Sequence, residues 1–309
     1  MSRVLVTGGA GFIGSHLARR ALSEGHSVVV VDNLSTGYRH QIPDGADFIY
    51  ADLGNPAHYN RLRDEKPDVI FHLAAQSSGW VSFDSPMRDL EDNTHATILI
   101  SQWALQQGCK RLLFASTESV FGEGQGRNPF DEKSLPLPLS FYGASKLACE
   151  HYLRISHQEL GLEHTCLRLF TVYGPKQDLA NMRQGIVSIY LTYILKGGPV
   201  TVTGSLDRVR DLVIVDDVVD AFWRASKTPA TIGKELVVAT GEHITLGKLI
   251  KDLGKAFGHP DIAIETTGGT PGDVLESYGN SALLRELTGW KPTCTVAEGI
   301  ARIRASFPK

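Results

Sequence analysis

The sequence predicts an α/β protein built on a doubly wound parallel sheet, with a smaller mixed α/β lobe towards the C-terminus. Short runs of β-branched residues alternate with helical stretches through the first two thirds of the chain. These runs show no polar alternation, which is typical of parallel strands that helices cover on both faces. The length of 309 residues suits one large domain with an appendage, or two lobes.

The expected elements follow the chain in alternating order. Residues 11–24 are predicted to form a helix because apolar Ile13, Leu17 and Ala21 recur at helical spacing. The two longest helices are expected to stop at Gly108 and Gly161, since glycine commonly ends a helix. Strands are expected at residues 4–7, 28–32, 48–50, 69–73, 111–116 and 165–169, and helices at 11–24, 86–107 and 140–160.

The pattern changes after the Gly-Pro pair at residues 174–175. A helix expected at 181–195 is ended by the Gly-Gly-Pro sequence at 197–199. A strand at 211–215 and a helix at 217–226 then return to the earlier pattern. We therefore expect two units: a larger domain of residues 1–175, to which 210–240 return, and a smaller substrate-binding lobe of residues 176–209 and 241–309.

Composition excludes several classes of protein. Lys and Arg number 31 and Asp and Glu 34, and this net charge of −3 argues against nucleic acid or anionic membranes as partners. The longest apolar runs, such as 28–31 and 212–215, are far shorter than the roughly 18 to 20 residues of a membrane span. The N-terminus runs into a strand-like segment without a signal-peptide pattern.

The cysteines and histidines show no spacing typical of metal ligands. The four cysteines lie far apart in the sequence, at Cys109, Cys149, Cys166 and Cys294. We therefore expect a cytoplasmic protein with reduced thiols and no metal.

A glycine-rich turn separates the first strand from the first helix. Gly9, Gly11 and Gly14 satisfy G-x-G-x-x-G, and Gly8, Gly11 and Gly14 satisfy G-x-x-G-x-x-G. Such glycines let the backbone approach a pyrophosphate, which the helix N-terminus binds. Asp32 ends the second strand about 20 residues on, where a carboxylate can accept hydrogen bonds from a ribose. This pattern predicts a Rossmann-type dinucleotide site that prefers NAD, because the carboxylate would repel the 2′-phosphate of NADP.

A second motif, at residues 142–146, opens a helix with a tyrosine and a lysine four residues apart. Tyr142 and Lys146 therefore share one helical face. A phenol titrates near 10, and a neighbouring ammonium lowers that value towards the range of a working general base. A tyrosine and a lysine at this spacing are common in helices. Their catalytic role is predicted here because they follow a dinucleotide-binding motif in the same chain.

Matching segments along nearly the whole chain resemble a known family, the extended short-chain dehydrogenase/reductases in their nucleotide-sugar epimerase/dehydratase branch. These segments are residues 7–14, 31–37, 51–53, 71–76, 116–117, 142–146, 168–175 and 210–217. The resemblance implies NAD as cofactor, a nucleoside-diphosphate sugar as substrate, and a homodimer formed through the helices at 86–107 and 140–160.

The resemblance also implies a role for each matching residue. Thr117, Tyr142 and Lys146 would be catalytic. The residues implied to bind the cofactor are Gly8, Gly11, Phe12, Ile13, Gly14, Asp32, Asn33, Ser35, Thr36, Gly37, Asp52, Leu53, Leu73, Ala74, Ala75, Asn93 and Ser116, together with Tyr142 and Lys146. Those implied to bind the substrate are Glu118, Thr171, Asn181, Arg210 and Asp273, with Arg210 on the diphosphate.

Three positions depart from the family pattern. Dehydratases of the branch carry an acid–base pair after the Ser/Thr, but Ser119 stands at the second position and only Glu118 is present in that segment. Thr270 stands where relatives often carry an arginine for the nucleotide, and Asp178 stands where glucuronate epimerases carry an arginine for the sugar carboxylate. The single carboxylate favours an epimerase over a dehydratase, and Asp178 favours a neutral sugar. Thr270 leaves the identity of the nucleotide open.

The leading prediction is an NAD-dependent epimerase that inverts C4 of a nucleoside-diphosphate sugar through a transient 4-keto sugar. A 4,6-dehydratase or a keto-sugar reductase on the same fold is the first alternative. A dinucleotide sensor without turnover is the second. The presence of both Tyr142 and Lys146 argues against a sensor, which has no need of them.

Overall fold

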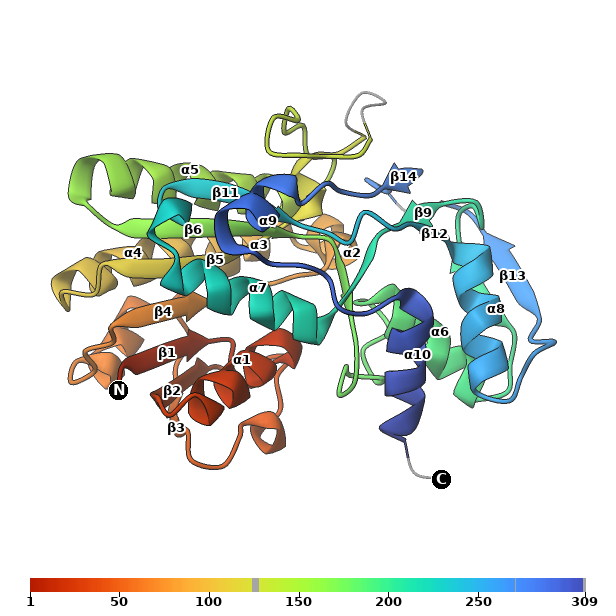
Figure 1. Cartoon of the computed structure of the whole chain (residues 1–309), viewed down its shortest axis with the longest axis horizontal. Coiled ribbons are helices and arrows are strands. Elements are labelled where there is room, and N and C mark those ends of the chain that lie inside the picture. The colour runs from red at the N-terminus through yellow and green to blue at the C-terminus, as the bar shows by residue number, and fades with distance from the viewer. Residues whose placement is uncertain (124–127, 270, 308–309) are drawn as a thin grey trace.

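The computed structural model describes residues 1–123, 128–269 and 271–307. A seven-stranded parallel sheet lies at its centre, in the order β11-β6-β5-β4-β1-β2-β3 (Figure 1). The order reverses at β1, so a crevice opens where the carboxyl ends of β1 and β4 diverge, which is where such sheets bind ligands. The strands are β1 (Arg3–Thr7), β2 (Ser27–Asp32), β3 (Asp47–Tyr50), β4 (Val69–His72), β5 (Arg111–Thr117), β6 (Glu163–Leu169) and β11 (Lys234–Val238).

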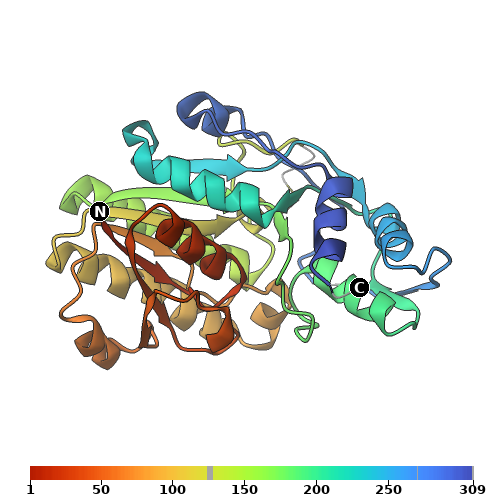
Figure 2. The ribbon, with the colours of Figure 1, turned by 60° about the horizontal axis from the view of Figure 1, so that its bottom comes forward.

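Helices cover both faces of this sheet (Figures 1 and 2). On one face α1 (Phe12–Ser23) packs against α7 (Val215–Lys227), and on the other α4 (Ala96–Gln106) packs against α5 (Phe141–Leu160). The Ser140 hydroxyl caps the start of α5 by accepting from the Gly143 amide, and Gly161 ends it in a left-handed conformation. Short helical turns join these layers: η1 (Arg39–Gln41), η2 (Pro56–Leu62), α2 (Gly79–Asp84), α3 (Pro86–Asp89), η4 (Glu118–Val120) and η6 (Pro229–Thr231).

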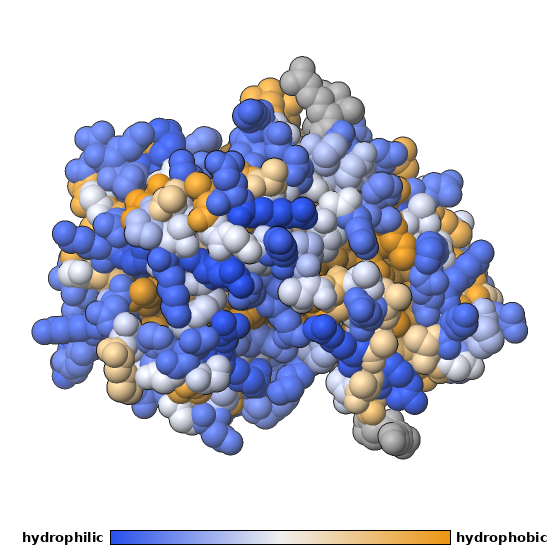
Figure 3. Space-filling model, viewed as in Figure 1, coloured by the Kyte–Doolittle hydropathy of each residue, from blue (hydrophilic) through white to orange (hydrophobic). Residues whose placement is uncertain are grey.

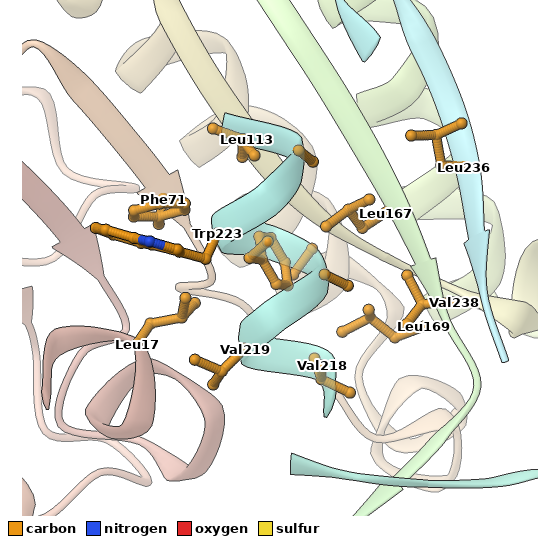
Figure 4. Packing of buried hydrophobic residues seen from close by; sticks show 14 of the residues in the cluster. Leu17, Phe71, Leu113, Leu167, Leu169, Val218, Val219, Trp223, Leu236 and Val238 are labelled. Carbon is orange, nitrogen blue, oxygen red and sulfur yellow. The ribbon is translucent and has the colours of Figure 1, made fainter. Parts of the chain in front are cut away.

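The apolar face of α7 forms the centre of the larger core (Figure 4). Trp223 lies between α1 and the sheet, where its ring stacks on Phe71 at 6.2 Å between centroids. Val218 and Val219 pack in the same layer. Since a fully buried side chain of this size contributes roughly 1.5–3 kcal/mol, this layer fixes α7 firmly on the sheet.

Alternate residues of each central strand face opposite helical layers. Val28 and Val30 join the core under α7, whereas Val29 and Val31 join the core under α4 and α5. All four are at most 1% exposed. This confirms the prediction, from the uninterrupted apolar runs, of a parallel sheet covered on both faces.

The smaller lobe has a separate core. Leu191 of α6 (Ile186–Leu195), Leu249 of α8 (Leu246–Ala256) and Ile300 of α10 (Val296–Ala305) meet in it. Small sheets complete the lobe: β7 (Thr171–Tyr173) with β10 (Leu212–Ile214), β8 (Val200–Thr203) with β13 (Ile264–Thr267), and β9 (Val209–Arg210) between β12 (Ile244–Thr245) and β14 (Glu276–Ser277).

Three elements differ from the sequence-based expectation. The helix expected at 86–107 contains a π-helical segment, η3 (Leu90–His95), between α3 and α4. The helix expected at 181–195 begins only at Ile186, because Gly185 adopts a φ of 82° outside the helical region. Helix α9 (Ala282–Thr288) packs on β11, and Trp290 lies in the larger core, so this part of the expected smaller lobe contacts the larger domain.

The surface is described by its hydropathy. The face seen in Figure 3 is mainly hydrophilic, with apolar side chains scattered over it. Across residues 1–123, 128–269 and 271–307, no helix has the length and apolar character that crossing a membrane requires.

Candidate active site

One cavity of about 520 Å³ lies between the carboxyl edge of the central sheet and the smaller lobe. Every site residue expected from the sequence lines it except Asn93. Ser119 and Asp178, which depart from the family pattern, line it as well. Residues that the sequence did not point to also line it, among them Gln41, Ser77, Asp92, Gln177 and Gln184. The fold therefore brings the predicted cofactor and substrate residues into one space.

The glycine turn forms one end of the cavity. Gly8 has a φ of 66°, and a Cβ added there would lie 2.7 Å from the amide nitrogen of Ala74. A Cβ on Gly14 would lie 2.2 Å from the Gly8 carbonyl oxygen. Gly11 occupies the N-cap of α1 without a side-chain cap, which leaves the first amides of the helix free for an anion. The turn therefore has no room for side chains, and this lets a pyrophosphate approach the backbone amides.

Asp32, at the end of β2, is held by two backbone donors. The Ala10 amide donates to Oδ2 at 3.0 Å, and the Leu34 amide donates to Oδ1 at 2.8 Å. Burial raises the pKa of the Asp32 carboxyl, and both hydrogen bonds oppose that effect. Each oxygen keeps a further lone pair, so the carboxylate can still accept from a ribose.

We expect Asp32→Ala to weaken NAD binding more than NADP binding. A hydrogen bond to a charged group contributes about 1.5–3 kcal/mol, or roughly 10- to 100-fold in affinity, and NADP does not use it. Fluorescence titration of both cofactors measures the ratio. Asp32→Asn keeps the size of the side chain but can accept only one of the two amide hydrogen bonds, so it separates the loss of charge from the loss of volume. An equal loss for both cofactors would show that Asp32 does not contact the ribose.

A buried hydrogen-bond chain fixes the wall formed by Leu73 and Ala74. Their amides donate to Thr7 Oγ1, each at 3.1 Å. The Thr7 hydroxyl therefore donates its own proton to His72 Nδ1 at 2.8 Å, which leaves Nε2–H to donate to Thr97 Oγ1 at 3.1 Å. Burial lowers the pKa of His72 to about 3, so this ring is neutral and structural.

Asn93 lies behind the cavity wall rather than on it. Its Nδ2 donates to Ser145 Oγ at 2.9 Å and to Asp89 Oδ1 at 3.2 Å. Gln76 Nε2 also donates to both oxygens of Asp89. The predicted cofactor contact of Asn93 is therefore corrected to a packing contact that holds the first turn of α5 beside the cavity.

Tyr142 and Lys146 project from the first turns of α5, as their spacing predicts. Lys146 is 2% exposed, and its Nζ donates to the Ala115 carbonyl at 2.9 Å. Burial lowers the pKa of Lys146 to about 8, which leaves most of it charged at neutral pH. Burial raises the pKa of Tyr142 to about 12, and a hydrogen bond with Thr117 acts in the opposite direction. A positive charge beside the phenol is therefore needed before Tyr142 can serve as a base near pH 7.

Ser116 lines the cavity, but its hydroxyl points away from it. Ser116 Oγ donates to Glu150 Oε1 at 2.5 Å. Arg168 donates to the same carboxylate through Nε at 3.0 Å and through a terminal nitrogen at 2.7 Å. Glu150 and Arg168 form a buried ion pair behind Ser116. The Ser116 hydroxyl is therefore already bonded within the protein, and the expected cofactor contact of this residue stays a prediction.

Glu118 is a half-buried residue that lines the cavity beside Arg210. Thr171 Oγ1 donates to one of its oxygens at 3.2 Å, and Ser277 Oγ donates to the other. Burial raises the pKa of Glu118 to about 7, and the charge of Arg210 opposes that rise.

Arg210 reaches the cavity from β9, but Asp273 holds it there. Arg210 donates to Asp273 and to the Val209 carbonyl, and Arg208 pairs with the same carboxylate. Two guanidinium groups against one carboxylate leave one positive charge in excess, which favours an anion such as a diphosphate. Thr270, which departs from the family pattern, lies outside the described residues.

The segment 176–185 closes the cavity from the smaller lobe. Asp178 accepts from the Tyr38 hydroxyl at 3.1 Å, and Gln184 donates to Ser77 Oγ. Asn181 lies in a turn before α6, where its Oδ1 accepts from the Arg183 amide, and so it does not open a helix. These contacts span 140 and 107 residues of sequence, and nothing in the local sequence indicates them.

Known proteins place the chain in a family. A model described as the NAD dependent epimerase/dehydratase family matches residues 4–243. The chain belongs to this family. The UDP-glucose 4-epimerase of Mycolicibacterium smegmatis is 37% identical over 97% of this chain and 96% of its own.

Solved structures of epimerases share the fold of this family member. The UDP-glucose 4-epimerase of Thermotoga maritima, solved with UDP-glucose, has a TM-score of 0.94 at 33% identity, covering 98% of both chains. The Thermus thermophilus enzyme, solved with NAD, has a TM-score of 0.92 at 36% identity, again covering 98% of both. These similarities confirm the predicted branch, the α/β fold and NAD as cofactor, and they favour the epimerase prediction over its alternatives.

The cavity fits NAD on its own evidence. The Gly8–Gly14 turn leaves room where a Cβ would collide with backbone, and Asp32 stands at the ribose position. Asp52 sits beyond it with Oδ1 accepting from the Gly54 amide at 2.9 Å. Gly37 also lacks room for a side chain, since a Cβ there would lie 2.8 Å from the Ala10 carbonyl carbon. This family member thus carries a continuous cradle from the pyrophosphate turn to the adenosine end.

Proposed function

We propose that the protein interconverts UDP-hexoses that differ at C4. One observation carries this proposal: Tyr142, which hydrogen-bonds with Thr117, and Lys146 line the same cavity as the glycine turn, Glu118 and Arg210. A general base (Tyr142), a cation (Lys146) and an arginine that can bind an anion (Arg210) therefore line one cavity. The uridine nucleotide is proposed because the named relatives and neighbours act on or bind UDP-sugars.

The residues divide the reaction among them. Tyr142 takes the proton of the C4 hydroxyl, while Thr117 holds that hydroxyl by a hydrogen bond. Lys146 stabilises the phenolate by its charge. When bound, NAD supplies the acceptor and then the donor of the hydride at C4. Once the 4-keto sugar has presented its other face, Tyr142 returns the proton to oxygen, so the reaction is redox-neutral overall.

The cavity favours a neutral sugar. Asp178 and Glu118 both line it, and a sugar carboxylate close to either would meet like-charge repulsion. Arg210 offers the compensating positive charge on β9, where we place the diphosphate. A diphosphate must compete with Asp273 for this guanidinium, so Asp273 acts on substrate binding through Arg210.

The test is a panel of UDP-, GDP-, CDP- and dTDP-hexoses incubated with the purified protein, with products identified by NMR. We expect UDP-glucose and UDP-galactose to interconvert without net consumption of added NAD. A stable 4-keto product would assign the dehydratase alternative, and net use of NADH would assign the reductase. NAD binding without turnover of any sugar nucleotide would assign the sensor.

Glu118→Gln separates an epimerase from a dehydratase. An epimerase already has its proton acceptor in Tyr142, so we expect turnover to fall less than about 10-fold. A dehydratase loses a general acid or base, which costs on the order of 100-fold or more. Steady-state kinetics on UDP-galactose decide between them. Gln keeps the size of the side chain and one acceptor oxygen, so it can accept from Thr171 or from Ser277 but not from both. A 100-fold loss together with a 4-keto-6-deoxy product contradicts the proposal.

We further propose that residues 1–175 and 210–240 form the dinucleotide-binding domain, and that residues 176–209 and 241–309 form the substrate-binding lobe. Glu118, Thr171 and Arg210 of the first unit also face the substrate space, and α9 of the second packs on β11. We also propose that the protein is a cytoplasmic homodimer. Exposed apolar side chains on the helical segments 86–107 and 140–160 support the dimer: Met87, Leu90, Tyr152 and Ile155 are each 48–61% exposed. We expect Ile155→Lys to convert a dimer to a monomer in light scattering, while Lys248→Glu on the smaller lobe leaves the mass unchanged. A wild-type monomer contradicts the dimer proposal.

A further inference from the structure

Three metal-ligating side chains gather at the edge of the central sheet, away from the cavity. They are His164 and Cys166 of β6 and Glu235 of β11, and their ligating atoms all lie within 4.8 Å of one another. Cys166 pairs with Glu235 across the two parallel strands, and His164 is two residues from Cys166. All three therefore point to the same face of the sheet.

The two ring nitrogens of His164 are buried without hydrogen-bond partners among the described residues. The whole side chain is fully buried. A buried donor or acceptor without a partner costs about 1–3 kcal/mol, so such a group normally has a partner of some kind. The ring is held in place by His157 of α5, which meets it edge-on at 5.5 Å between centroids.

We propose that His164, Cys166 and Glu235 bind one zinc ion. An imidazole, a thiolate and a carboxylate form a mixed N, S and O set that suits zinc and disfavours magnesium or calcium. Binding would release one proton from the Cys166 thiol. The thiolate and the carboxylate then cancel the two charges of the ion, which a buried site requires. Arg168, further along the same face, is already neutralised by Glu150.

The geometry needs only a small adjustment. Zinc bonds of about 2.0–2.3 Å at tetrahedral angles place ligand atoms about 3.5 Å apart. The present separations of at most 4.8 Å therefore close by little more than about 1 Å. Glu235 is half-buried on the edge strand, which gives the ion an entry path and leaves the fourth position for water.

The site would be structural rather than catalytic. Leu169 of β6 lines the cavity, and about 16 Å of extended strand separates it from His164. An ion shared by β6 and β11 would clip the edge strand to the sheet. The sequence analysis predicts no metal, because the spacing His-x-Cys on one strand and a distant glutamate matches no common motif.

The test uses the full-length protein, reduced and stripped of metal by a chelator, then titrated with Co²⁺ and with Zn²⁺. We expect a thiolate-to-cobalt charge-transfer band that saturates at one ion per chain, and a melting temperature that rises with zinc. Cys166→Ser should abolish the band. Glu235→Gln should keep it while weakening zinc about 10- to 100-fold or more, since even a supporting residue has effects of that size.

Cys109→Ser is the matched control, because Cys109 is another buried free thiol and lies outside the cluster. It should bind both metals as the wild type does. The proposal is overturned if the wild type shows no charge-transfer band at one equivalent of cobalt, or if Cys166→Ser retains it. If Cys166→Ser does not fold, the unchanged zinc affinity of Glu235→Gln would overturn it instead.

Discussion

Tyr142→Phe should lower epimerase turnover by about 10² to 10⁴, because removal of a general base typically has an effect of that size. The substitution removes one oxygen and keeps the ring at the start of α5. NAD affinity should change little, since the cradle rests on the glycine turn and Asp32. Turnover of UDP-galactose, together with a cofactor titration, measures both effects. Wild-type turnover at every pH would show that Tyr142 is not the base.

Two further variants sharpen that result. Tyr173→Phe is the matched control, because Tyr173 is buried outside the cavity and its hydroxyl has no partner within the described residues. It should keep wild-type turnover. Lys146→Met removes the charge beside the phenol, so the pKa of Tyr142 should rise and the rate should increase only at higher pH. The Tyr142→Phe variant should show no such rise at any pH.

Arg168→Ala should lower the free energy of unfolding by about 3–5 kcal/mol, because it leaves the Glu150 carboxylate buried without its cation. Glu150 is 2% exposed and receives two hydrogen bonds from Arg168. Urea unfolding followed by circular dichroism measures the change. The effect should reach the active site as well, since Ser116 of the cavity wall donates to the same carboxylate.

An exposed ion pair provides the comparison. Lys248 and Asp252 lie one turn apart on α8, and Lys248 is 65% exposed. Such a pair contributes about 0.3–0.5 kcal/mol, so Lys248→Ala should be nearly silent. The double variant Glu150→Leu with Arg168→Met should lose less stability than Arg168→Ala, because it leaves no unpaired charge. A loss below about 1 kcal/mol in Arg168→Ala would show that the pair is not stabilising.

The parts of the site that depend on local sequence could be predicted. The glycine turn, Asp32 at a strand end, and Tyr142 with Lys146 on one helical face follow from spacing alone. Their positions also follow from the fold class, since parallel strands direct their carboxyl ends to one edge. The structure brings these residues into one cavity as expected.

Other parts depend on contacts between distant segments, which spacing does not encode. Asp273, expected to bind the substrate, lines the cavity, but the sequence does not show that Arg208 and Arg210 converge on it. Ser116, expected to bind the cofactor, also lines the cavity, but the sequence does not show that its hydroxyl donates to a carboxylate of α5. The cluster of His164, Cys166 and Glu235 forms only when β11 joins the sheet beside β6.

The route of the chain between the lobes limits how the cavity can open. After β7 the chain enters the smaller lobe, returns through α7 and β11, leaves again, returns in α9 and Trp290, and ends in α10. The polypeptide chain thus crosses between the two lobes several times, and the lobes are not joined by a single linker. A hinge motion would have to bend several crossings together, whereas displacement of residues 176–185 at the rim bends none of the others. We therefore expect substrate to enter by movement of this segment rather than by rotation of one core against the other.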